Sequence, residues 1–347
     1  MLGFIMKKKS GVLIINLGTP DSSSVADVRR YLREFLMDGR VIDIPWLNRF
    51  LLVQGIIAPT RAPQSAKIYQ ELWMPDGSPL KIYGEGVVKL LQAALGEDYH
   101  VALGMRYQNP SIAKALEPFK DRGIEDLTVI PLYPQYASAS TGSTIEMVFE
   151  LIKSWQVIPS VKVISQFLDH PLFLKAFVEL GAKHMVQTRY DHFIFSYHGL
   201  PERQIKKAAV ENYCQLNEKC CSAYHAKNRY CYRAQCFETT RSLVKGLGIA
   251  EGQTTVCFQS RLGKDPWIKP YTDEVIKHLA AAGVKNVLAF SPSFVSDCLE
   301  TTVEIGVEYK HMFEQCGGQR WDMVESLNDS PQWIECLKSI ILMNSQK

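Results

Sequence analysis

The amino-acid sequence predicts an α/β protein with two doubly wound, Rossmann-like domains, each built on a parallel sheet. Short apolar runs rich in β-branched residues recur along the chain, and amphipathic stretches lie between them. Runs that are apolar without alternation are typical of strands buried on both faces, and their alternation with helical patterns indicates β-α-β units. A chain of 347 residues also exceeds the size of most single cores, which favours two domains.

The predicted strands divide into two sets around residue 170. They are 11–17, 101–105, 127–133, 161–165, 193–197, 254–258 and 286–290. The turn at Asp169-His170-Pro171 marks the division, so we expect an N-terminal domain over 1–170, a C-terminal domain over 171–330 and a C-terminal helix over 331–347. Ligands of such sheets bind beyond the carboxyl ends of the strands. We therefore expect a binding cleft between the two domains.

The composition argues against several classes of function. The 39 basic and 36 acidic residues give a formal net charge of +3, which does not indicate a nucleic-acid partner. No Gly-x-Gly-x-x-Gly motif is present, so a nucleotide cofactor is not expected. No stretch reaches the roughly 20 apolar residues of a membrane-spanning helix, and the first residues do not resemble a secretory signal. We expect a cytoplasmic protein.

His198 is the first candidate for chemistry. It ends the run Phe-Ile-Phe-Ser-Tyr-His at 193–198, and Gly199 and Pro201 after it indicate a turn that leaves the imidazole at the edge of the sheet. A histidine in this position can accept a proton or bind a metal ion. A structural histidine is the alternative that position alone leaves open.

Three glutamates recur at intervals of four residues: Glu300, Glu304 and Glu308. This spacing places them along one side of a helix, where like charges repel each other, so a solvated helix face is the plain interpretation. Val303 and Val307 lie between the acids, however, and the segment follows a buried strand. The alternative is a partly buried ladder of carboxylates that relays cations or protons.

Aromatic side chains follow several predicted strands. They are Tyr107, Tyr133, Tyr136, Trp267 and Tyr271. Together with nearby arginines such as Arg106, they suit a flat apolar ligand that carries carboxylate groups, although core packing explains each aromatic residue taken singly.

The stretch 46–57 has more apolar residues than one buried helix stripe needs. They are Trp46, Leu47, Phe50, Leu51, Leu52, Val53, Ile56 and Ile57. One interpretation is a core helix. The other is an exposed apolar lip that admits a hydrophobic macrocycle or contacts a membrane surface.

Five of the nine cysteines lie within 214–236: Cys214, Cys220, Cys221, Cys231 and Cys236. In a cytosolic protein a local group of cysteines indicates a metal site more than disulfides. The spacing matches neither a zinc ribbon nor a plant ferredoxin. We predict an iron-sulfur cluster bound by Cys214, Cys221, Cys231 and Cys236, with Cys220 as the alternative to Cys221. A zinc site is the other interpretation.

Taken together, the motifs resemble those of the protoporphyrin ferrochelatases, which insert ferrous iron into a porphyrin in the last step of haem synthesis. The matching motifs occur in the family's order over nearly the whole chain. They are Val12-Leu-Ile-Ile-Asn-Leu-Gly-Thr-Pro, Gly77-Ser-Pro-Leu, Met105-Arg-Tyr, Pro131-Leu-Tyr-Pro-Gln-Tyr, Ser196-Tyr-His-Gly-Leu-Pro, Phe258-Gln-Ser-Arg-Leu-Gly, Pro266-Trp, Tyr271-Thr-Asp-Glu and Ser296-Asp-Cys-Leu-Glu-Thr. The resemblance implies a chelatase fold whose substrates are a porphyrin and Fe2+.

The resemblance also implies a role for each candidate residue. His198 and Glu300 would handle the ferrous iron and the pyrrole protons, and Glu304 and Glu308 would continue the acidic path. The macrocycle would be lined by Met37, Arg106, Tyr107 and Trp267, to which we add Tyr133 from its place after a strand.

Some bacterial relatives resemble this chain in the cysteine segment and carry a [2Fe-2S] cluster bound entirely by internal cysteines. Others place cluster ligands near the C-terminus, where this chain has only Cys336. The segment 212–231 looks like an insertion within the family pattern, and we treat 212–236 as a cysteine-rich insertion in the second domain.

Other functions stay open at this point. A chelatase that uses coproporphyrin or another divalent metal would show the same motifs. A non-catalytic carrier of iron or haem would also have two lobes around a cleft, and the cysteine segment alone could be a redox module. We expect a cytoplasmic location with peripheral contact to the inner membrane, and the sequence does not indicate an oligomeric state.

Overall fold

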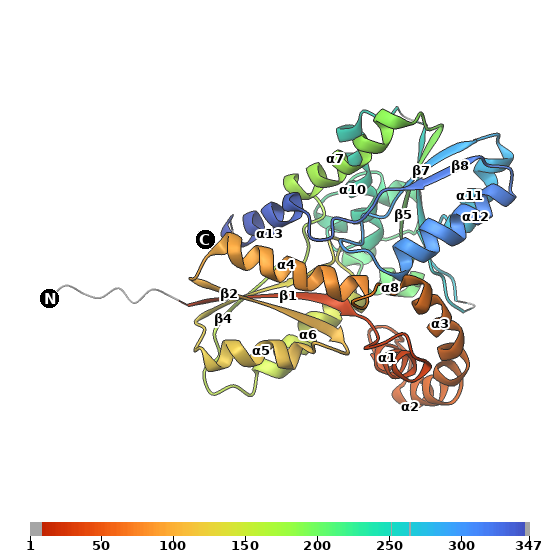
Figure 1. Ribbon diagram of the computed structural model, residues 1–347. Coiled ribbons are helices and arrows are strands. Elements are labelled where there is room, and N and C mark those ends of the chain that lie inside the picture. The colour runs from red at the N-terminus through yellow and green to blue at the C-terminus, as the bar shows by residue number, and fades with distance from the viewer. Residues whose placement is uncertain (1–8, 251, 264, 344–347) are drawn as a thin grey trace. The chain divides into compact units, whose positions relative to one another are not determined.

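The computed structural model describes residues 9–250, 252–263 and 265–343, and these form two compact units (Figure 1). The first unit contains the described residues of 1–132, 138–166 and 329–347, and the second contains 133–137 and 167–328. Both are parallel α/β units, as the sequence predicts. The cleft expected between them stays a prediction.

The first unit is built on a parallel sheet with the strand order β2-β1-β3-β4. The strands are β1 (Ser10–Gly18), β2 (Tyr99–Tyr107), β3 (Asp126–Pro131) and β4 (Ser160–Val163). Strand β1 lies between β2 and β3, and its residues Val12 to Ile15 are fully buried. This burial on both faces explains why the strand reads as an unbroken apolar run.

The helices of the first unit cover both faces of this sheet. They are α1 (Val25–Met37), α2 (Trp46–Phe50), η1 (Leu51–Ile57), α3 (Ala58–Leu72), α4 (Pro79–Leu95), α5 (Ile112–Asp121), η2 (Ser138–Gly142), α6 (Ser143–Ile152) and α13 (Pro331–Met343). Helix α4 lies on the face opposite α5 and α6 (Figure 1). Helix α13, which the sequence analysis treats as a segment of its own, packs against α4 in this unit.

Gly18 lets the end of β1 approach its neighbour closely. Its backbone has a φ of +115°, and a Cβ atom there would lie 2.0 Å from the carbonyl oxygen of Tyr107. Only glycine fits both conditions. The close approach brings the carboxyl ends of β1 and β2 together, which is the edge where this kind of sheet binds ligands.

The second unit repeats the arrangement, with the strand order β6-β5-β7-β8. The strands are β5 (His192–His198), β6 (Thr254–Gln259), β7 (Asn286–Phe290) and β8 (Arg320–Met323). Strand β8 is missing from the sequence-based prediction. It is a short edge strand with the sequence Arg-Trp-Asp-Met, so it has no apolar run to reveal it.

The helices of the second unit also lie on both faces of its sheet, with α7 and α10 on one side and α11 and α12 on the other (Figure 1). The helical segments are α7 (Pro171–Gln187), α8 (Glu202–Lys207), η3 (Val210–Asn212), α9 (Glu218–Cys221), η4 (Ala226–Asn228), α10 (Tyr232–Leu247), α11 (Thr272–Ala281), η5 (Leu299–Glu308) and α12 (Tyr309–Gln315). The cysteine-rich insertion contains the short segments α9 and η4, and η3 ends at its first residue, Asn212.

The apolar stretch 46–57 is partly buried and partly exposed. Val53 is fully buried, whereas Trp46, Leu47, Leu51 and Ile56 are each about 60% exposed. Helix α2 and the π-helix η1 therefore combine a core contact with an apolar surface. In the part of the chain that the structure describes, no helix is long and apolar enough to cross a membrane.

Candidate active site

His198 lies at the carboxyl end of β5 and is partly buried. Its Nδ1 is 2.7 Å from the carbonyl oxygen of Gly199. Since a carbonyl oxygen only accepts hydrogen bonds, Nδ1 carries the proton in the neutral ring and Nε2 keeps the lone pair. The imidazole is thus set up to accept a proton or to bind a metal ion through Nε2.

The glutamate series lies on η5, a π-helix, in which each N–H bonds to the carbonyl five residues earlier. Glu300 and Glu304 are partly buried and Glu308 is exposed. The series therefore runs from the interior to solvent along one short helix. It is not a fully solvated face, because Glu300 and Glu304 are partly buried.

The carboxylate of Glu304 accepts four hydrogen bonds, two at each oxygen. Oε1 accepts from the backbone N–H of Ser260 at 3.0 Å and from the hydroxyl of Tyr309 at 2.9 Å. Oε2 accepts from Gln259 Nε2 at 3.1 Å and from the hydroxyl of Ser260. These donors fasten the middle of the π-helix to the end of β6 and to the start of α12.

The pKa of Glu304 shows that His198 and the acids share one electrostatic environment. Burial raises this pKa above its ordinary value, and the negative charge of Glu300 adds to the effect. The hydrogen bond from Ser260, the electrostatic interaction with His198 and the hydrogen bond from Tyr309 oppose it without cancelling it. The structure therefore brings His198, Glu300 and Glu304 together, whereas Glu308 is further out on the same helix.

Gln259 joins the two sides of this site. It lies opposite His198 in the β5–β6 ladder, and its Nε2 also donates to the carbonyl oxygen of Glu300 at 3.0 Å. Its Oε1 accepts from the hydroxyl of Ser196 at 2.6 Å. The sequence analysis missed this residue as a site component, although a polar pair directly after a buried strand was a usable signal.

Cys298 supports Glu300 from the residue before the π-helix. Its thiol is fully buried and hydrogen-bonded to Glu300, and burial raises the pKa of Cys298 well above its ordinary value. The thiol therefore stays protonated and donates to the carboxylate.

Trp267 and Tyr133, both expected to contact the macrocycle, lie in the same unit as His198. The indole ring of Trp267 is tilted by 48° to the imidazole of His198, with ring centroids 6.4 Å apart. Tyr133 is partly buried and begins a segment whose Gln135 and Tyr136 are hydrogen-bonded to α10. The structure thus places Trp267 beside the imidazole.

Arg106 and Tyr107 belong to a buried polar network in the first unit. Asp38 Oδ2 accepts from Arg106 at 2.6 Å and from the hydroxyl of Tyr107 at 2.9 Å, and Ser143 donates to the same oxygen. Met37, the last residue of α1, immediately precedes Asp38 and is partly buried. The charge of Arg106 is therefore already paired.

The Asp38 carboxyl is ionised more readily than an ordinary aspartate. Burial raises its pKa, but the hydrogen bonds from Ser143, the Arg40 backbone and Tyr107, together with the charge of Arg106, outweigh burial and hold the pKa below its usual range. The pair of Asp38 and Arg106 is a structural ion pair with side chains 6% and 11% exposed.

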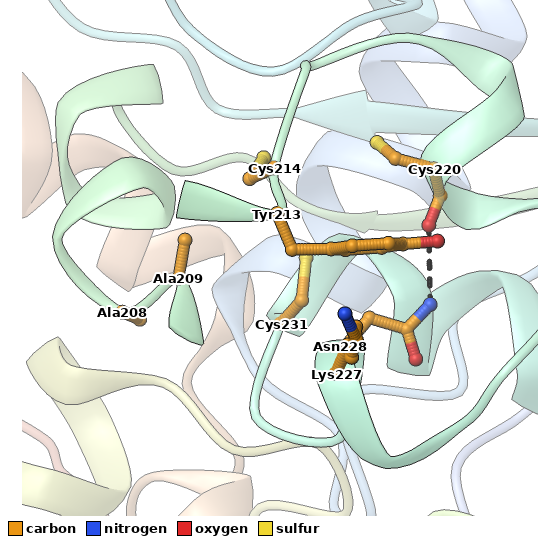
Figure 2. A pocket seen from close by; sticks show the side chains of 8 residues that line it. All are labelled: Ala208, Ala209, Tyr213, Cys214, Cys220, Lys227, Asn228 and Cys231. Atoms are coloured by element: carbon orange, nitrogen blue, oxygen red, sulfur yellow. Dashed lines mark hydrogen bonds between the residues drawn. The ribbon is translucent and has the colours of Figure 1, made fainter. Parts of the chain in front are cut away.

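The cysteines of the insertion gather in the second unit. Cys231 is hydrogen-bonded to Cys214 and to Cys221, and the sulfur atoms of Cys220 and Cys221 are 3.9 Å apart. We call these four residues the thiol cluster. Figure 2 shows three of them, Cys214, Cys220 and Cys231, lining one small pocket with the ring of Tyr213.

The thiol cluster differs from the predicted ligand set in one member. Cys236 is on the buried side of α10, where its thiol is hydrogen-bonded to Tyr232. Its only interaction with the thiol cluster among the causes that shift its pKa is electrostatic, from Cys221. The pKa of Cys214 and the pKa of Cys221 are each lowered to about 6. The largest cause in both cases is the hydrogen bond with Cys231. Because the single S–H of Cys231 donates to one sulfur atom at a time, it favours a thiolate at Cys214 or at Cys221.

The described residues contain no group of three or more histidine, cysteine, aspartate or glutamate side chains that could hold a metal ion as they stand. This holds for the thiol cluster and for His198 with its neighbouring acids. Metal binding at either place requires side chains to turn toward the ion.

The Asp38 network predicts a pH-dependent loss of stability. Asp38→Asn should lower the free energy of unfolding at pH 7 by roughly 2–4 kcal/mol, because it leaves the Arg106 guanidinium buried without an anion. A lowered folded-state pKa gives stability that is present above the unfolded pKa of about 4 and is lost as pH falls through the folded value. The difference between the wild type and the variant should therefore shrink below about pH 4.

Urea unfolding at several pH values measures this difference. The control is Asp27→Asn, which removes the partner of Arg30, a guanidinium that is 59% exposed, and should cost less than about 1 kcal/mol. Equal effects of the two substitutions at pH 7 would contradict a buried structural ion pair.

Comparison with known proteins identifies the family. The profile of the ferrochelatase family matches residues 9–345. The ferrochelatase of Legionella pneumophila (strain Lens) is 45% identical over 333 residues, which cover 96% of this chain and 98% of that protein. The ferrochelatase of Coxiella burnetii (strain Dugway 5J108-111) is 43% identical over 329 residues, or 95% of this chain and 92% of that protein. Among solved structures, SirB from Bacillus subtilis with Fe3+ matches with a TM-score of 0.52 at 11% identity and covers 97% of both chains, which shows a shared fold alone. The chain belongs to the ferrochelatase family.

Proposed function

We propose that this protein inserts Fe2+ into protoporphyrin IX in the last step of haem synthesis, and that His198 and Glu300 carry the reaction. One observation supports the assignment most strongly: an imidazole with its lone pair on Nε2 shares an electrostatic environment with two partly buried carboxylates at the carboxyl end of a sheet. Ferrous iron is a substrate here, not a resident cofactor.

The charge balance of the reaction explains why both kinds of side chain are needed. A dication enters the macrocycle and two pyrrole protons leave it. His198 Nε2 takes a pyrrole proton or holds the iron briefly, and Glu300 complements it as the second acceptor. Imidazole and carboxylate bind ferrous iron less firmly than thiolates would, so the iron can be passed on.

Glu304 and Glu308 have different roles in the proposed proton and iron path. Glu304 already accepts from four donors, so it holds the π-helix in place and exchanges a proton rather than binding iron. Glu308 is exposed and connects the series to solvent. Protons leave, and iron enters, along this side of η5.

The contacts that we propose for the porphyrin ring are Trp267 and Tyr133, which are in the second unit, and Met37, which is in the first. Tyr107 is fully buried, so it supports the first unit from within and does not offer surface to the ring. Because Arg106 is paired with Asp38, we expect it to hold Tyr107 in place and not to supply a free cation for a propionate.

The proposal predicts that His198→Ala lowers kcat for iron insertion by about 100-fold or more, since a positioned acid-base group contributes at least that factor. An anaerobic assay at saturating porphyrin and Fe2+ measures it. The control is His184→Ala, which removes a half-exposed imidazole paired with Glu325 and should leave kcat within twofold. Normal insertion by the His198 variant would show that the assignment is wrong.

We also propose that the cysteine-rich insertion binds a [2Fe-2S] cluster, which when bound supplies a redox-active centre. The chemistry of the donors supports this, because four thiols lie close together and the pKa values of Cys214 and Cys221 are each lowered to about 6. The contacts favour Cys220 over Cys236 as the fourth ligand, beside Cys214, Cys221 and Cys231. Turning the side chains toward two irons replaces the hydrogen bonds among the thiols.

The cluster proposal predicts visible absorption in the anaerobically purified protein that bleaches on reduction with dithionite. Cys231→Ser should abolish it, because this thiol contacts two others of the thiol cluster. Cys316→Ser, which changes an exposed cysteine on another element, should retain it. Zinc in place of iron, or absorption that survives the Cys231 substitution, would contradict the proposal.

We propose, finally, that the exposed apolar residues of α2 and η1 contact the membrane surface, with the protein in the cytoplasm and peripheral to the inner membrane. Trp46, Leu47, Phe50, Leu51 and Ile56 are exposed on two consecutive segments. A group of exposed apolar side chains of this size needs a partner, and a lipid surface is suitable for a protein with a hydrophobic substrate.

This proposal predicts that Leu51→Glu weakens binding to vesicles of phosphatidylcholine and phosphatidylglycerol by about tenfold, since one buried leucine contributes about 1.5–3 kcal/mol. Cosedimentation measures the binding. The control Val157→Glu changes an apolar residue that is more exposed, 79% against 59% for Leu51, and that lies outside α2 and η1, so it should have no effect. Equal binding by the wild type and the Leu51 variant would exclude this surface as the contact.

A further inference from the structure

Strand β5 extends beyond the end of its neighbour β7. The pairing of β5 with β7 ends where Phe195 faces Phe290, so the following residues of β5 have no strand partner on that side. Side-chain hydroxyls take over there. Ser291 donates to the carbonyl oxygen of Ser196 at 3.1 Å, and Tyr232 donates to that of His198 at 3.0 Å. Two alternate carbonyls of the strand are satisfied by side chains in place of a ladder.

The second of these donors, Tyr232, lies in a buried position that favours its hydrogen bond to the His198 carbonyl. It is the first residue of α10, and only 6% of its surface is exposed. Its hydroxyl donates to the carbonyl oxygen of His198 from this buried position, so the side chain has little freedom to leave the bond.

Tyr232 is also attached to the thiol cluster. It directly follows Cys231, the N-cap residue of α10, whose thiol is hydrogen-bonded to Cys214 and Cys221. The next residue, Arg233, donates to the carbonyl oxygens of Asn217 and Lys269, each at 3.2 Å. A displacement of Cys231 must therefore move Tyr232, and with it the donor to His198.

We propose that Tyr232 is a positioning residue for His198, and that its hydroxyl is the link through which the thiol cluster acts on the imidazole. The inference rests on the proposed role of His198. The backbone at His198 is held on one side by the bond from Gly199 N to Gln259 O at 2.8 Å and on the other by Tyr232. Removing the second restraint loosens the direction in which Nε2 points.

The first test compares Tyr232→Phe with Tyr224→Phe. Both remove only a hydroxyl, but the hydroxyl of Tyr224 donates to the carbonyl oxygen of Arg229 at 3.0 Å, within the insertion. Tyr232→Phe should lower kcat by about three- to tenfold, the effect of losing one ordinary hydrogen bond, with the KM for porphyrin unchanged. Tyr224→Phe should leave both constants within twofold.

The second test asks whether the thiol cluster acts through Tyr232. Cys214→Ser should lower kcat in the wild-type background but change it by less than about twofold in the Tyr232→Phe background, because the link is already cut. An equal effect in both backgrounds, or no effect in the wild type, would overturn the coupling.

The outcomes separate this inference from the proposed function. If His198→Ala is inactive while Tyr232→Phe keeps wild-type kcat, the inference fails and the function stands. If His198→Ala is fully active, the function itself fails. Should Tyr232→Phe not fold, as judged by its thermal unfolding, 4-aminophenylalanine at position 232 keeps the shape and replaces the hydroxyl with a weaker donor, which should lower kcat. An unchanged kcat in that protein would equally overturn the inference.

Discussion

The hydrogen-bonded carboxylate of Glu304 is the constraint on which the candidate active site depends. A π-helix of this length is rare, and its hydrogen bonds alone do not account for it. Glu304 holds the middle of η5 to the end of β6 through Gln259 and Ser260, and to α12 through Tyr309. Gln259 then adds a bond to the carbonyl of Glu300. Gln259 also lies opposite His198 in the β5–β6 ladder. One short network of hydrogen bonds therefore connects the strand ends that hold the imidazole to the start of η5, where Glu300 lies.

The two units treat a buried carboxylate in opposite ways. In the first, Asp38 has a guanidinium beside it and its pKa is lowered, so it stays ionised and serves structure. In the second, the donors to Glu304 are neutral groups, and its pKa is raised. A carboxylate with a raised pKa is a stronger proton acceptor than an ordinary glutamate, which suits a site that must dispose of pyrrole protons.

The cysteine-rich insertion is joined to the rest of the second unit by a few specific bonds. Asn228 donates to the carbonyl oxygen of Cys220, as Figure 2 shows, and this bond organises the insertion internally. Tyr232 and Arg233, at the start of α10, connect it outward to the His198 strand and to the Lys269 loop. A change in the state of the cysteines can therefore alter the position of the β5 end, because Tyr232 and Arg233 at the start of α10 are bonded to His198 and Lys269.

The sequence by itself determined the two parallel sheets, the family, and the kinds of side chain at the site. Strands buried on both faces appear as unbroken apolar runs, and motifs such as Ser196-Tyr-His-Gly-Leu-Pro directly follow them. Only the tertiary structure decided what those side chains contact. Strand β8 could not be predicted, because its four residues, Arg-Trp-Asp-Met, form no apolar run. The pairing of Arg106 with Asp38, the four donors to Glu304 and the thiol cluster without Cys236 could not be predicted either. Each joins positions that are close only after the chain has folded, and a local pattern does not contain the distance between them.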